Sequence, residues 1–363
     1  MLEKRWRRWA ALAAVLPALV LAAGCGDDDD DSGDSGGGGA ELTEVKLLLS
    51  FPESLIWSSL LVAQDQGYFE EEGLEVTSEG TDGSAFVTQQ VISGNVDFGW
   101  AAADSDIIAY GTDERLRVVM CHQEQNIFRI VTLADSDIQS VDDLAGKTLG
   151  YTEKGGGEEP LVNSALGDAG IKDDVKLLPI GAAGPQSRAA IEDGTVDAYA
   201  SSYPDISSLT AAGLEFRDIT PEKFNGTPGD CLVTRDDVLE DPDKRKIIEG
   251  IARAWAKGSL FTIEYPEETL ELGCKVVPEE CEDMESARLL VEDTAKLLQP
   301  LEDGAPIGSL FQDGWQTTAD VLLETGAIED AVDVAGLIAS DASKEIEEQV
   351  LAPVTEEGAP APK

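Results

Sequence analysis

The sequence repeats one short pattern about a hundred residues apart, and this repeat restricts the folds that the chain can adopt. Gly83-Ser84 opens a helical run that ends at Gly94-Asn95-Val96-Asp97, and Gly184-Pro185 opens one that ends at Gly194-Thr195-Val196-Asp197. Each copy predicts a helix, a glycine in the left-handed region that ends it, and a buried strand. Two copies predict two similar α/β lobes, each with its own parallel sheet. A chance match of four short positions is the alternative.

The stretch from residue 45 to residue 76 is the clearest single unit of the first lobe. Its pattern indicates a strand at residues 45–49, a helix with Pro52 at an early position, and a second strand. The turn at residues 50–54 follows the carboxyl end of the first strand, where open α/β sheets bind their ligands. Trp57, one turn into the helix, either lines that site or packs in the core.

The charge of the chain excludes some functions. There are 26 Lys+Arg against 72 Asp+Glu, a formal net charge of -46. Such a field repels phosphate backbones and favours a soluble monomer, so we expect no nucleic-acid partner. The chain has one histidine, His122, and no CxxC motif, which leaves too few ligands for a zinc site. We therefore predict no metal and no cofactor, and we place His122 at the surface or the hinge.

The first residues are typical of a targeting segment. Four basic residues precede an apolar run at residues 9–23, which predicts a signal peptide over residues 1–24. Residues 21–25, LAAGC, resemble the lipobox of bacterial lipoproteins, with the leucine one position early, so Cys25 is the expected lipid acceptor. Ordinary signal cleavage is the alternative. Residues 25–40, rich in Asp, Gly and Ser, predict a disordered tether.

Four further cysteines permit three disulfide connectivities. Cys274 and Cys281 lie close together around Pro278, so we expect them to pair, which leaves Cys121 to pair with Cys231.

The order of elements predicts how the chain divides. We expect lobe 1 over residues 41–127, lobe 2 over 128–228, a return to lobe 1 with C-terminal helices over 229–345, and a disordered tail over 346–363. The strands near residues 127–133 and 231–234 are expected to cross between the lobes and form a hinge.

Several motifs together resemble a known protein family. They are Gly67-Tyr68-Phe69, Gly73-Leu74-Glu75-Val76, Ser93-Gly94-Asn95-Val96-Asp97 and the run from Asp142 to Lys147. These motifs resemble the solute-binding proteins of ABC transporters, in the group that serves nitrate, sulfonates, taurine and thiamine pyrimidine precursors. The resemblance implies the type II periplasmic-binding-protein fold: α/β, with two Rossmann-like lobes joined by a hinge of crossing strands and a helical C-terminal part. It also implies an ABC permease as partner and, with the lipid anchor, a location at the outer face of the cytoplasmic membrane.

In that group the ligand lies between two closing lobes, so the resemblance assigns the site to the turns at the strand ends. The ligand-binding residues that it implies are Ser50, Glu53, Trp57, Gly83, Ser84, Trp100, Asp104, Tyr151, Lys154, Gly156, Glu158, Tyr203 and Asp205.

We predict a small, neutral or weakly charged heteroaromatic ligand, such as a thiamine pyrimidine precursor. The four aromatic residues of that set can stack on a flat ring, and Asp104 and Asp205 can accept hydrogen bonds from an exocyclic amine. The alternative is a sulfonate, taurine or nitrate ion held by the glycine loop after Lys154. A second alternative is a lipoprotein enzyme, because a related eukaryotic branch of the fold makes the pyrimidine with a histidine as substrate. We nominate no catalytic residue.

Overall fold

The computed structural model describes residues 42–81, 83–154 and 156–363. The predicted signal peptide, the tether and the lipid acceptor Cys25 lie outside the described residues. So do Asp82 and Gly155, which belong to two of the predicted ligand-binding turns.

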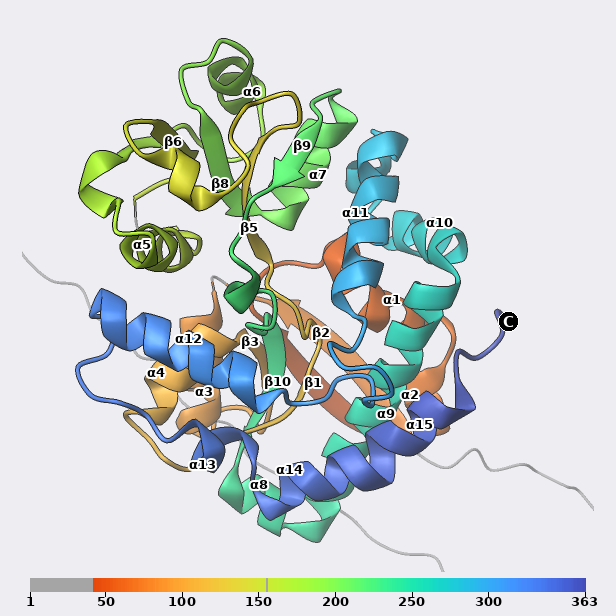
Figure 1. Ribbon diagram of the computed structural model, residues 1–363. Coiled ribbons are helices and arrows are strands. Elements are labelled where there is room, and N and C mark those ends of the chain that lie inside the picture. Colours follow the sequence, from red (N-terminus) through yellow and green to blue (C-terminus); the bar gives the residue numbers. More distant parts are fainter. Residues whose placement is uncertain (1–41, 82, 155) are drawn as a thin grey trace, which may run out of the picture. The chain divides into compact units, whose positions relative to one another are not determined.

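The described residues form two five-stranded sheets with the same strand arrangement (Figure 1). The lobe 1 sheet has the order β2-β1-β3-β10-β4, and the lobe 2 sheet has the order β7-β6-β8-β5-β9. The lobe 1 strands are Thr43–Leu49 (β1), Leu74–Gly80 (β2), Gly99–Ala102 (β3), Leu116–Cys121 (β4) and Asp230–Arg235 (β10). The lobe 2 strands are Phe128–Leu133 (β5), Thr148–Tyr151 (β6), Lys176–Pro179 (β7), Ala198–Ser202 (β8) and Phe216–Asp218 (β9).

Both sheets are mixed, whereas the sequence predicted parallel sheets. In lobe 1, β10 runs antiparallel to β3 and β4, and in lobe 2, β5 runs antiparallel to β8 and β9. These two strands are the ones that follow the crossings at residues 122–127 and 219–229. The parallel strands end at the edges where the chain crosses. A strand that enters the sheet from the edge at which the parallel strands end must run antiparallel to them.

The helices connect the strands and complete the lobes. Those of the first lobe are Leu55–Trp57 (η1, 3-10), Ser58–Asp65 (α1), Tyr68–Glu71 (α2), Ser84–Ile92 (α3) and Ala103–Tyr110 (α4). Those of lobe 2 are Val141–Leu144 (η2), Glu159–Asp168 (α5), Lys172–Asp174 (η3), Pro185–Glu192 (α6), Tyr203–Ala211 (α7) and Glu222–Phe224 (η4). After β10 come Asp236–Glu240 (α8), Pro242–Glu264 (α9), Pro266–Val276 (α10), Pro278–Cys281 (η5), Met284–Leu297 (α11), Gln312–Thr325 (α12), Val334–Ile338 (α13), Asp341–Ile346 (α14), the π-helical turn Glu347–Leu351 (η6) and Ala352–Glu357 (α15).

The strand β1 is buried on both faces, as its apolar sequence predicts. Leu47 and Leu49 belong to a core with residues of α1 and α9, whereas Leu48 belongs to a core with residues of α3 and α4. Successive side chains of a strand point to opposite faces, so one apolar run supplies both cores.

The first helix begins later than the sequence predicted. Residues 51–54 form a bend and a loop, η1 follows, and α1 starts at Ser58. The Leu55 amide donates to Glu280 over 2.8 Å, so a carboxylate from the C-terminal helices caps this turn. A partner more than two hundred residues away leaves no local signal in the sequence.

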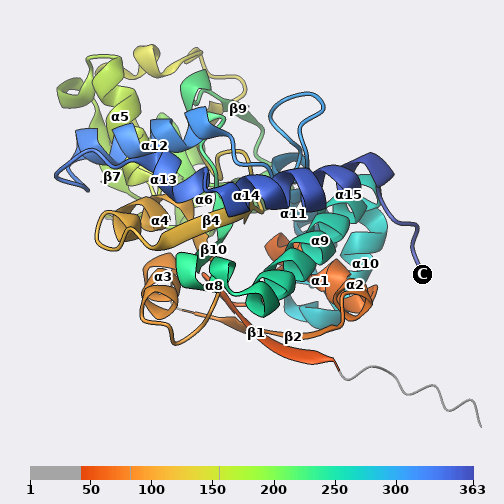
Figure 2. The same cartoon turned by 90° about the horizontal axis from the view of Figure 1, so that it is seen from below.

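The predicted disordered tail is wrong for most of its length. Residues 347–357 are helical and run beside α9 (Figure 2). Val350, Leu351 and Val354 are buried in the core that contains residues of α9. Ile346, Val350 and Val354 are spaced four residues apart and form one apolar stripe. The few apolar residues of this segment therefore suffice to dock it. The structure also forms both expected disulfides, Cys121–Cys231 and Cys274–Cys281.

Candidate functional site

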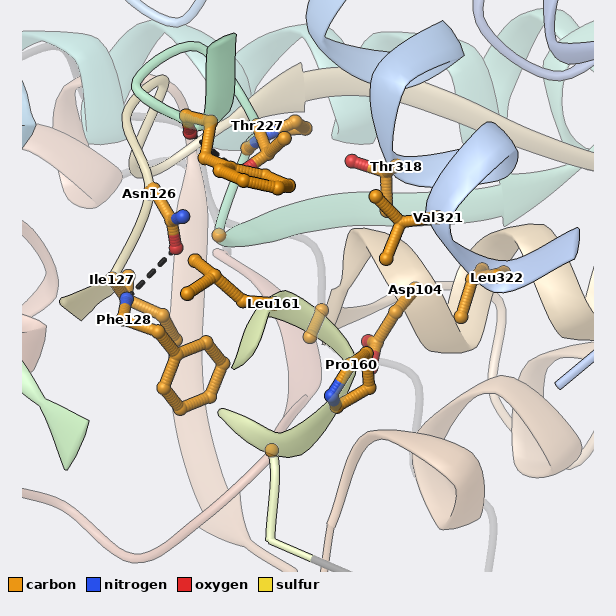
Figure 3. Close-up of a pocket in the computed structure, with 15 residues that line it drawn as sticks. Asp104, Asn126, Ile127, Phe128, Pro160, Leu161, Thr227, Thr318, Val321 and Leu322 are labelled. Carbon is orange, nitrogen blue, oxygen red and sulfur yellow. Dashed lines mark hydrogen bonds between the residues drawn. The ribbon is translucent and has the colours of Figure 1, made fainter. Parts of the chain in front are cut away.

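A cavity of about 80 Å³ lies where the two crossing segments meet both lobes, and we call it the hinge cavity (Figure 3). Its wall is mostly apolar, with Asp104 as its one charged side chain among the described residues. The ring of Phe128 and the side chain of Leu161 face Val321 and Leu322 of α12 across it. The lining residues are Ala102, Asp104, Asn126, Ile127, Phe128, Gly157, Pro160, Leu161, Phe224, Thr227, Pro228, Gly229, Thr318, Val321 and Leu322.

A second cavity, of about 390 Å³, lies at the ends of β6, β7 and β8, and we call it the lobe 2 cavity. It is polar and acidic, and it shares Phe128 with the hinge cavity. It is lined by Phe128, Thr152, Glu153, Glu158, Gly181, Ala182, Ser202 and Asp205.

Phe128 is the aromatic residue that joins the two cavities. It begins β5, its amide donates to Asn126 Oδ1 over 2.8 Å, and its side chain is only partly buried. A Cβ added to Gly157 would lie 2.5 Å from Phe128 Cζ, so the ring packs directly against the glycine backbone. Phe128 was not among the predicted ligand-binding residues, because the sequence indicated only a crossing role for its strand. The signal in the sequence was an aromatic residue at the start of that strand.

Three carboxyl groups lie close enough to influence one another in lobe 1, and of the three Asp104 alone lines the hinge cavity. Asp104 and Asp106 come from the first turn of α4, and Asp230 begins β10, where it lies opposite Ala102 of β3. Asp230 Oδ1 accepts a hydrogen bond from Ser50 Oγ over 2.7 Å. Asp104 was predicted from the sequence, whereas Asp106 and Asp230 were not. Asp230 lies on β10, far from α4 in the chain, so no local signal connects the two.

Burial raises the pKa of all three carboxyl groups. The pKa of Asp230 rises to about 6, chiefly by burial, with a smaller contribution from Asp104 and an opposing one from the Ser50 hydrogen bond. The pKa of Asp106 rises well above its usual value through burial and through the charges of Asp104 and Asp230. The pKa of Asp104 is raised by burial and lowered in part by Ser105. This corner of the site therefore disfavours further negative charge.

Two of the predicted carboxylates line the lobe 2 cavity, and each already accepts a hydrogen bond from a backbone amide. Glu158 is buried and accepts from the Thr152 amide over 2.7 Å and from the Thr152 hydroxyl. Asp205 accepts from the Ala183 amide over 2.8 Å and from the Ser201 hydroxyl. These amides are the donors that an anionic ligand would need at this edge.

The glycine loop does not form an anion cradle among its described residues. Lys154 is exposed and lines neither cavity. The Gly156 amide donates to the Glu153 carbonyl over 3.0 Å, and a Cβ on Gly156 would lie 2.7 Å from a Glu158 oxygen. The loop is therefore folded around the Glu158 carboxylate, which takes the place of an anion.

The four aromatic residues expected to clamp a ligand lie in the cores and line neither cavity. Trp57 and Trp100 are fully buried and pack against Trp255, with ring centroids 6.1 and 4.1 Å away. Tyr151 is buried in the core of lobe 2. Trp100 and Tyr151 are strand residues, and successive side chains of a strand point to opposite faces of the sheet, so these two enter the apolar layers.

The fourth, Tyr203, links the lobes. Its hydroxyl lies 3.1 Å from Thr294 Oγ1 of α11, and because the Thr294 hydroxyl donates to Leu290 O, the Tyr203 hydroxyl is the donor. Ser207 of α7 likewise donates to Asp293 of α11 over 2.5 Å. Figure 1 shows α7 beside α11. Hydrogen bonds between α7 and α11 therefore join the two lobes on this side of the hinge.

The remaining predicted residues shape lobe 1 near the hinge. Glu53 is exposed and accepts a hydrogen bond from Ser78. Gly83 precedes α3 with φ of 133°, and Ser84 Oγ accepts from the Ala102 amide over 3.0 Å. Ser84 thus ties α3 to the end of β3, whereas Glu53 and Gly83 line neither cavity.

His122 begins the crossing at residues 122–127, so of the two positions that the sequence suggested the hinge holds and the surface is wrong, because the ring is buried. It follows β4, is 2 % exposed, and its ring packs among Trp57, Trp100 and Trp255. Burial lowers its pKa to about 4, against a smaller effect of the hydrogen bond with Ile56 O. No cluster of potential metal ligands occurs in the described part of the chain. Among the same residues, every helix is too short or too polar to cross a membrane.

Comparisons with known proteins agree with this architecture. A family model described as NMT1/THI5 like matches residues 57–269. A 4-amino-5-hydroxymethyl-2-methylpyrimidine phosphate synthase of Legionella pneumophila is 24% identical over 65% of this chain and 75% of its own length. A formylaminopyrimidine-binding protein of Halalkalibacterium halodurans is 24% identical over 64% of this chain and 70% of its own.

Among solved structures, the periplasmic aliphatic sulphonate binding protein of Escherichia coli superposes with a TM-score of 0.62 at 19% identity. The match covers 82% of this chain and 91% of the other. The predicted fold is thereby confirmed: the described residues adopt the periplasmic-binding-protein fold, with two α/β lobes joined by crossing strands.

Proposed function

The chain belongs to the NMT1/THI5-like family, and from this premise we propose that it is the extracytoplasmic solute-binding component of an ABC importer. Its lobes close over a small heteroaromatic ligand of the thiamine pyrimidine precursor type. The ligand lies in the hinge cavity and the lobe 2 cavity, with Phe128 between them. An ABC permease and a lipid anchor on Cys25 complete the proposed system.

The observation that carries the ligand class is the chemistry of the two cavity walls. An aromatic ring is flanked by Asp104, Glu158 and Asp205, while no lysine or arginine is among the described lining residues. Carboxylates accept hydrogen bonds from the exocyclic amine of an aminopyrimidine, and an aromatic face stacks on its ring. Two relatives whose names contain a pyrimidine support the same class.

The alternative ligand, a sulfonate, taurine or nitrate, is supported by the fold shared with a sulphonate binding protein. It is disfavoured by Glu158 and Asp205, which already occupy the amides at the lobe 2 edge. An anion there would have to displace a carboxylate and then sit beside others.

The enzyme alternative, which the named synthase supports, is disfavoured by the position of His122. Both of its ring nitrogens are hydrogen-bonded inside the core of lobe 1, to Trp255 and to Ile56 O. A histidine consumed as substrate would have to reach a bound reactant. We therefore propose binding without catalysis.

Thermal unfolding of the purified full-length chain in detergent tests the ligand class. Hydroxymethyl- and formylamino-pyrimidines, taurine, an alkanesulfonate and nitrate are compared in parallel. A ligand at a hundred times its dissociation constant adds about 2.7 kcal/mol to stability, so a pyrimidine should raise the melting temperature visibly. Phe128→Ala should remove that shift, and Phe86→Ala, a matched change at a half-exposed ring of α3, should keep it. A shift with taurine or sulfonate and none with a pyrimidine would refute the proposal.

The lipid anchor is tested by fractionation of cells that carry wild-type protein or Cys25→Ala. We expect the wild type in the membrane fraction and the variant released, since lipid chains supply the membrane affinity. A wild-type protein found wholly in the soluble fraction contradicts the anchor.

A further inference from the structure

Asn126 lies in the first crossing between the lobes and in the wall of the hinge cavity. It belongs to the segment 122–127, which joins β4 to β5, and it is one of the residues that line the cavity. The residue is only 4 % exposed. The polar atoms of a side chain that is buried to this extent normally have hydrogen-bond partners, so an atom without one indicates a missing molecule.

All the polar groups of Asn126 except one have partners in the protein. The backbone amide donates to the Asn225 carbonyl over 3.1 Å, and the backbone carbonyl accepts from the Arg129 guanidinium. The side-chain oxygen Oδ1 accepts from the Phe128 amide over 2.8 Å. The side-chain nitrogen Nδ2 has no partner among the residues that the structure describes. Its two N–H groups are therefore the part of Asn126 that remains available.

The hydrogen bond to Phe128 decides how the side-chain amide is turned. A backbone N–H can only donate, so the Asn126 atom that faces it must be the oxygen. Because the amide group is planar and branches at Cγ, Nδ2 is directed away from the Phe128 amide. Figure 3 shows the nitrogen of Asn126 turned away from the hydrogen bond that the oxygen makes. The side chain thus presents a donor of fixed orientation in the cavity wall.

Among the described lining residues, no other side chain has a donor to spare. The two lining hydroxyls belong to Thr227 and Thr318, and each donates to a backbone carbonyl of its own turn, over 2.9 and 3.0 Å. The other lining side chains are apolar, apart from Asp104, whose charged carboxylate only accepts. Any hydrogen bond that this part of the wall donates from a side chain therefore comes from Asn126.

We propose that Asn126 selects the ligand by donating a hydrogen bond from Nδ2 to an acceptor atom of a flat ring that lies against Phe128. In an aminopyrimidine this acceptor is a ring nitrogen, beside the exocyclic amine that donates to Asp104. A ligand without such an acceptor leaves a buried amide unpaired, and the site therefore rejects it. The inference rests on the proposed function, because it names the residue that recognises the ligand at that same site.

Two probes of the same shape test the inference. They are 4-amino-5-hydroxymethyl-2-methylpyrimidine and its benzene analogue (2-amino-4-methylphenyl)methanol, which keeps the three substituents and has no ring nitrogen. Dissociation constants are measured by calorimetry on the full-length chain in detergent at pH 8, where both probes are neutral. We expect the pyrimidine to bind at least tenfold tighter, because its analogue leaves Nδ2 without an acceptor.

Asn126→Asp is the variant that isolates the donor. It keeps an oxygen for the Phe128 amide and replaces the Nδ2 donor with an acceptor of the same size. The preference for the pyrimidine should fall to less than about threefold. Asn95→Asp makes the same change at an exposed residue that lines neither cavity, and it should keep the preference. A general weakening of binding affects both probes alike and leaves their ratio unchanged.

The outcomes separate this inference from the proposed function. A preference that is unchanged in Asn126→Asp overturns the role of Asn126 and leaves the pyrimidine-binding function standing. Equal binding of the two probes by the wild type overturns that role without the need for any variant. If neither probe binds at millimolar concentration while taurine or a sulfonate does, the proposed function is refuted and the inference falls with it.

Discussion

His122 Nδ1 accepts a hydrogen bond from the indole Nε1 of Trp255, with 3.1 Å between the two nitrogens. Its Nε2 lies 2.9 Å from the carbonyl oxygen of Ile56, which can only accept, so Nε2 carries the proton. The imidazole is therefore neutral and held in one tautomer, and it joins the end of β4 to α9 and to η1.

This arrangement predicts a histidine that stays neutral well below its usual pKa. Burial lowers the pKa of His122 to about 4, so the native state binds this proton less readily than the unfolded chain. The free energy of unfolding is therefore unaffected by this group above pH 6.5. It decreases as the pH falls toward 4, by up to about 3 kcal/mol, because the unfolded chain takes up the proton first. In untagged protein the single histidine gives one set of nitrogen NMR signals. They should show the Nε2-protonated tautomer from pH 8 to pH 5. A midpoint near 6.5 would show that the ring is exposed.

The buried carboxyl group of Asp230 predicts a pH dependence of stability opposite to that of His122. Burial raises its pKa to about 6, so the proton stabilises the native state fully below about pH 4, and this effect is lost as the pH rises through 6. Asp230→Asn removes the charge and keeps an oxygen acceptor for Ser50. We expect this variant to be more stable than wild type at pH 7.5, by up to about 3 kcal/mol, and equal to it at pH 4. Urea unfolding at the two pH values measures this, and a variant less stable at pH 7.5 contradicts it.

The two disulfides should differ in their contribution to stability. Cys121–Cys231 closes a loop with a sequence separation of 110, which contains lobe 2, whereas Cys274–Cys281 has a separation of 7. The chain-entropy model gives about 4.8 kcal/mol for the first and about 2.4 for the second. We expect the Cys121→Ala/Cys231→Ala double variant to unfold at a clearly lower temperature than the Cys274→Ala/Cys281→Ala variant. Calorimetry of the two decides, and the reverse order would show that lost packing outweighs chain entropy.

The contact between Gly157 and the Phe128 ring predicts that one methyl group added at position 157 weakens ligand binding. The new Cβ of Gly157→Ala would lie 2.5 Å from Phe128 Cζ, so the ring must move out of its position between the two cavities. We expect ligand binding at least tenfold weaker, measured by calorimetry with the ligand that the unfolding screen identifies. Gly167→Ala is the matched control, since its Cβ meets only the end of Glu324 at 3.5 Å inside α5. That variant should keep its affinity and gain about 0.5–1 kcal/mol of stability. Equal affinities in the two variants would remove Phe128 from the site.

The sequence was sufficient for the parts of this protein that depend on local pattern. The repeated helix-glycine-strand unit and the apolar runs predicted two α/β lobes with crossing strands, and the positions of four cysteines predicted their pairing. These features are decided by neighbouring residues and by the periods of helix and strand. The same reasoning failed at residues 347–357, where only three sparse apolar residues hold the helices against α9.

The composition of the candidate site was decided by the tertiary structure. Asp230 lies beside α4 only because the chain returns across the hinge and β10 pairs with β3. Phe128 faces two cavities only because Gly157 of another segment lets its ring approach. From the sequence, Trp57 and Trp100 were plausible ligand-binding residues, yet both pack with Trp255 in the core. A residue's type and spacing limit what it can bind, but whether its side chain meets a cavity or a core depends on contacts with segments far away in the chain.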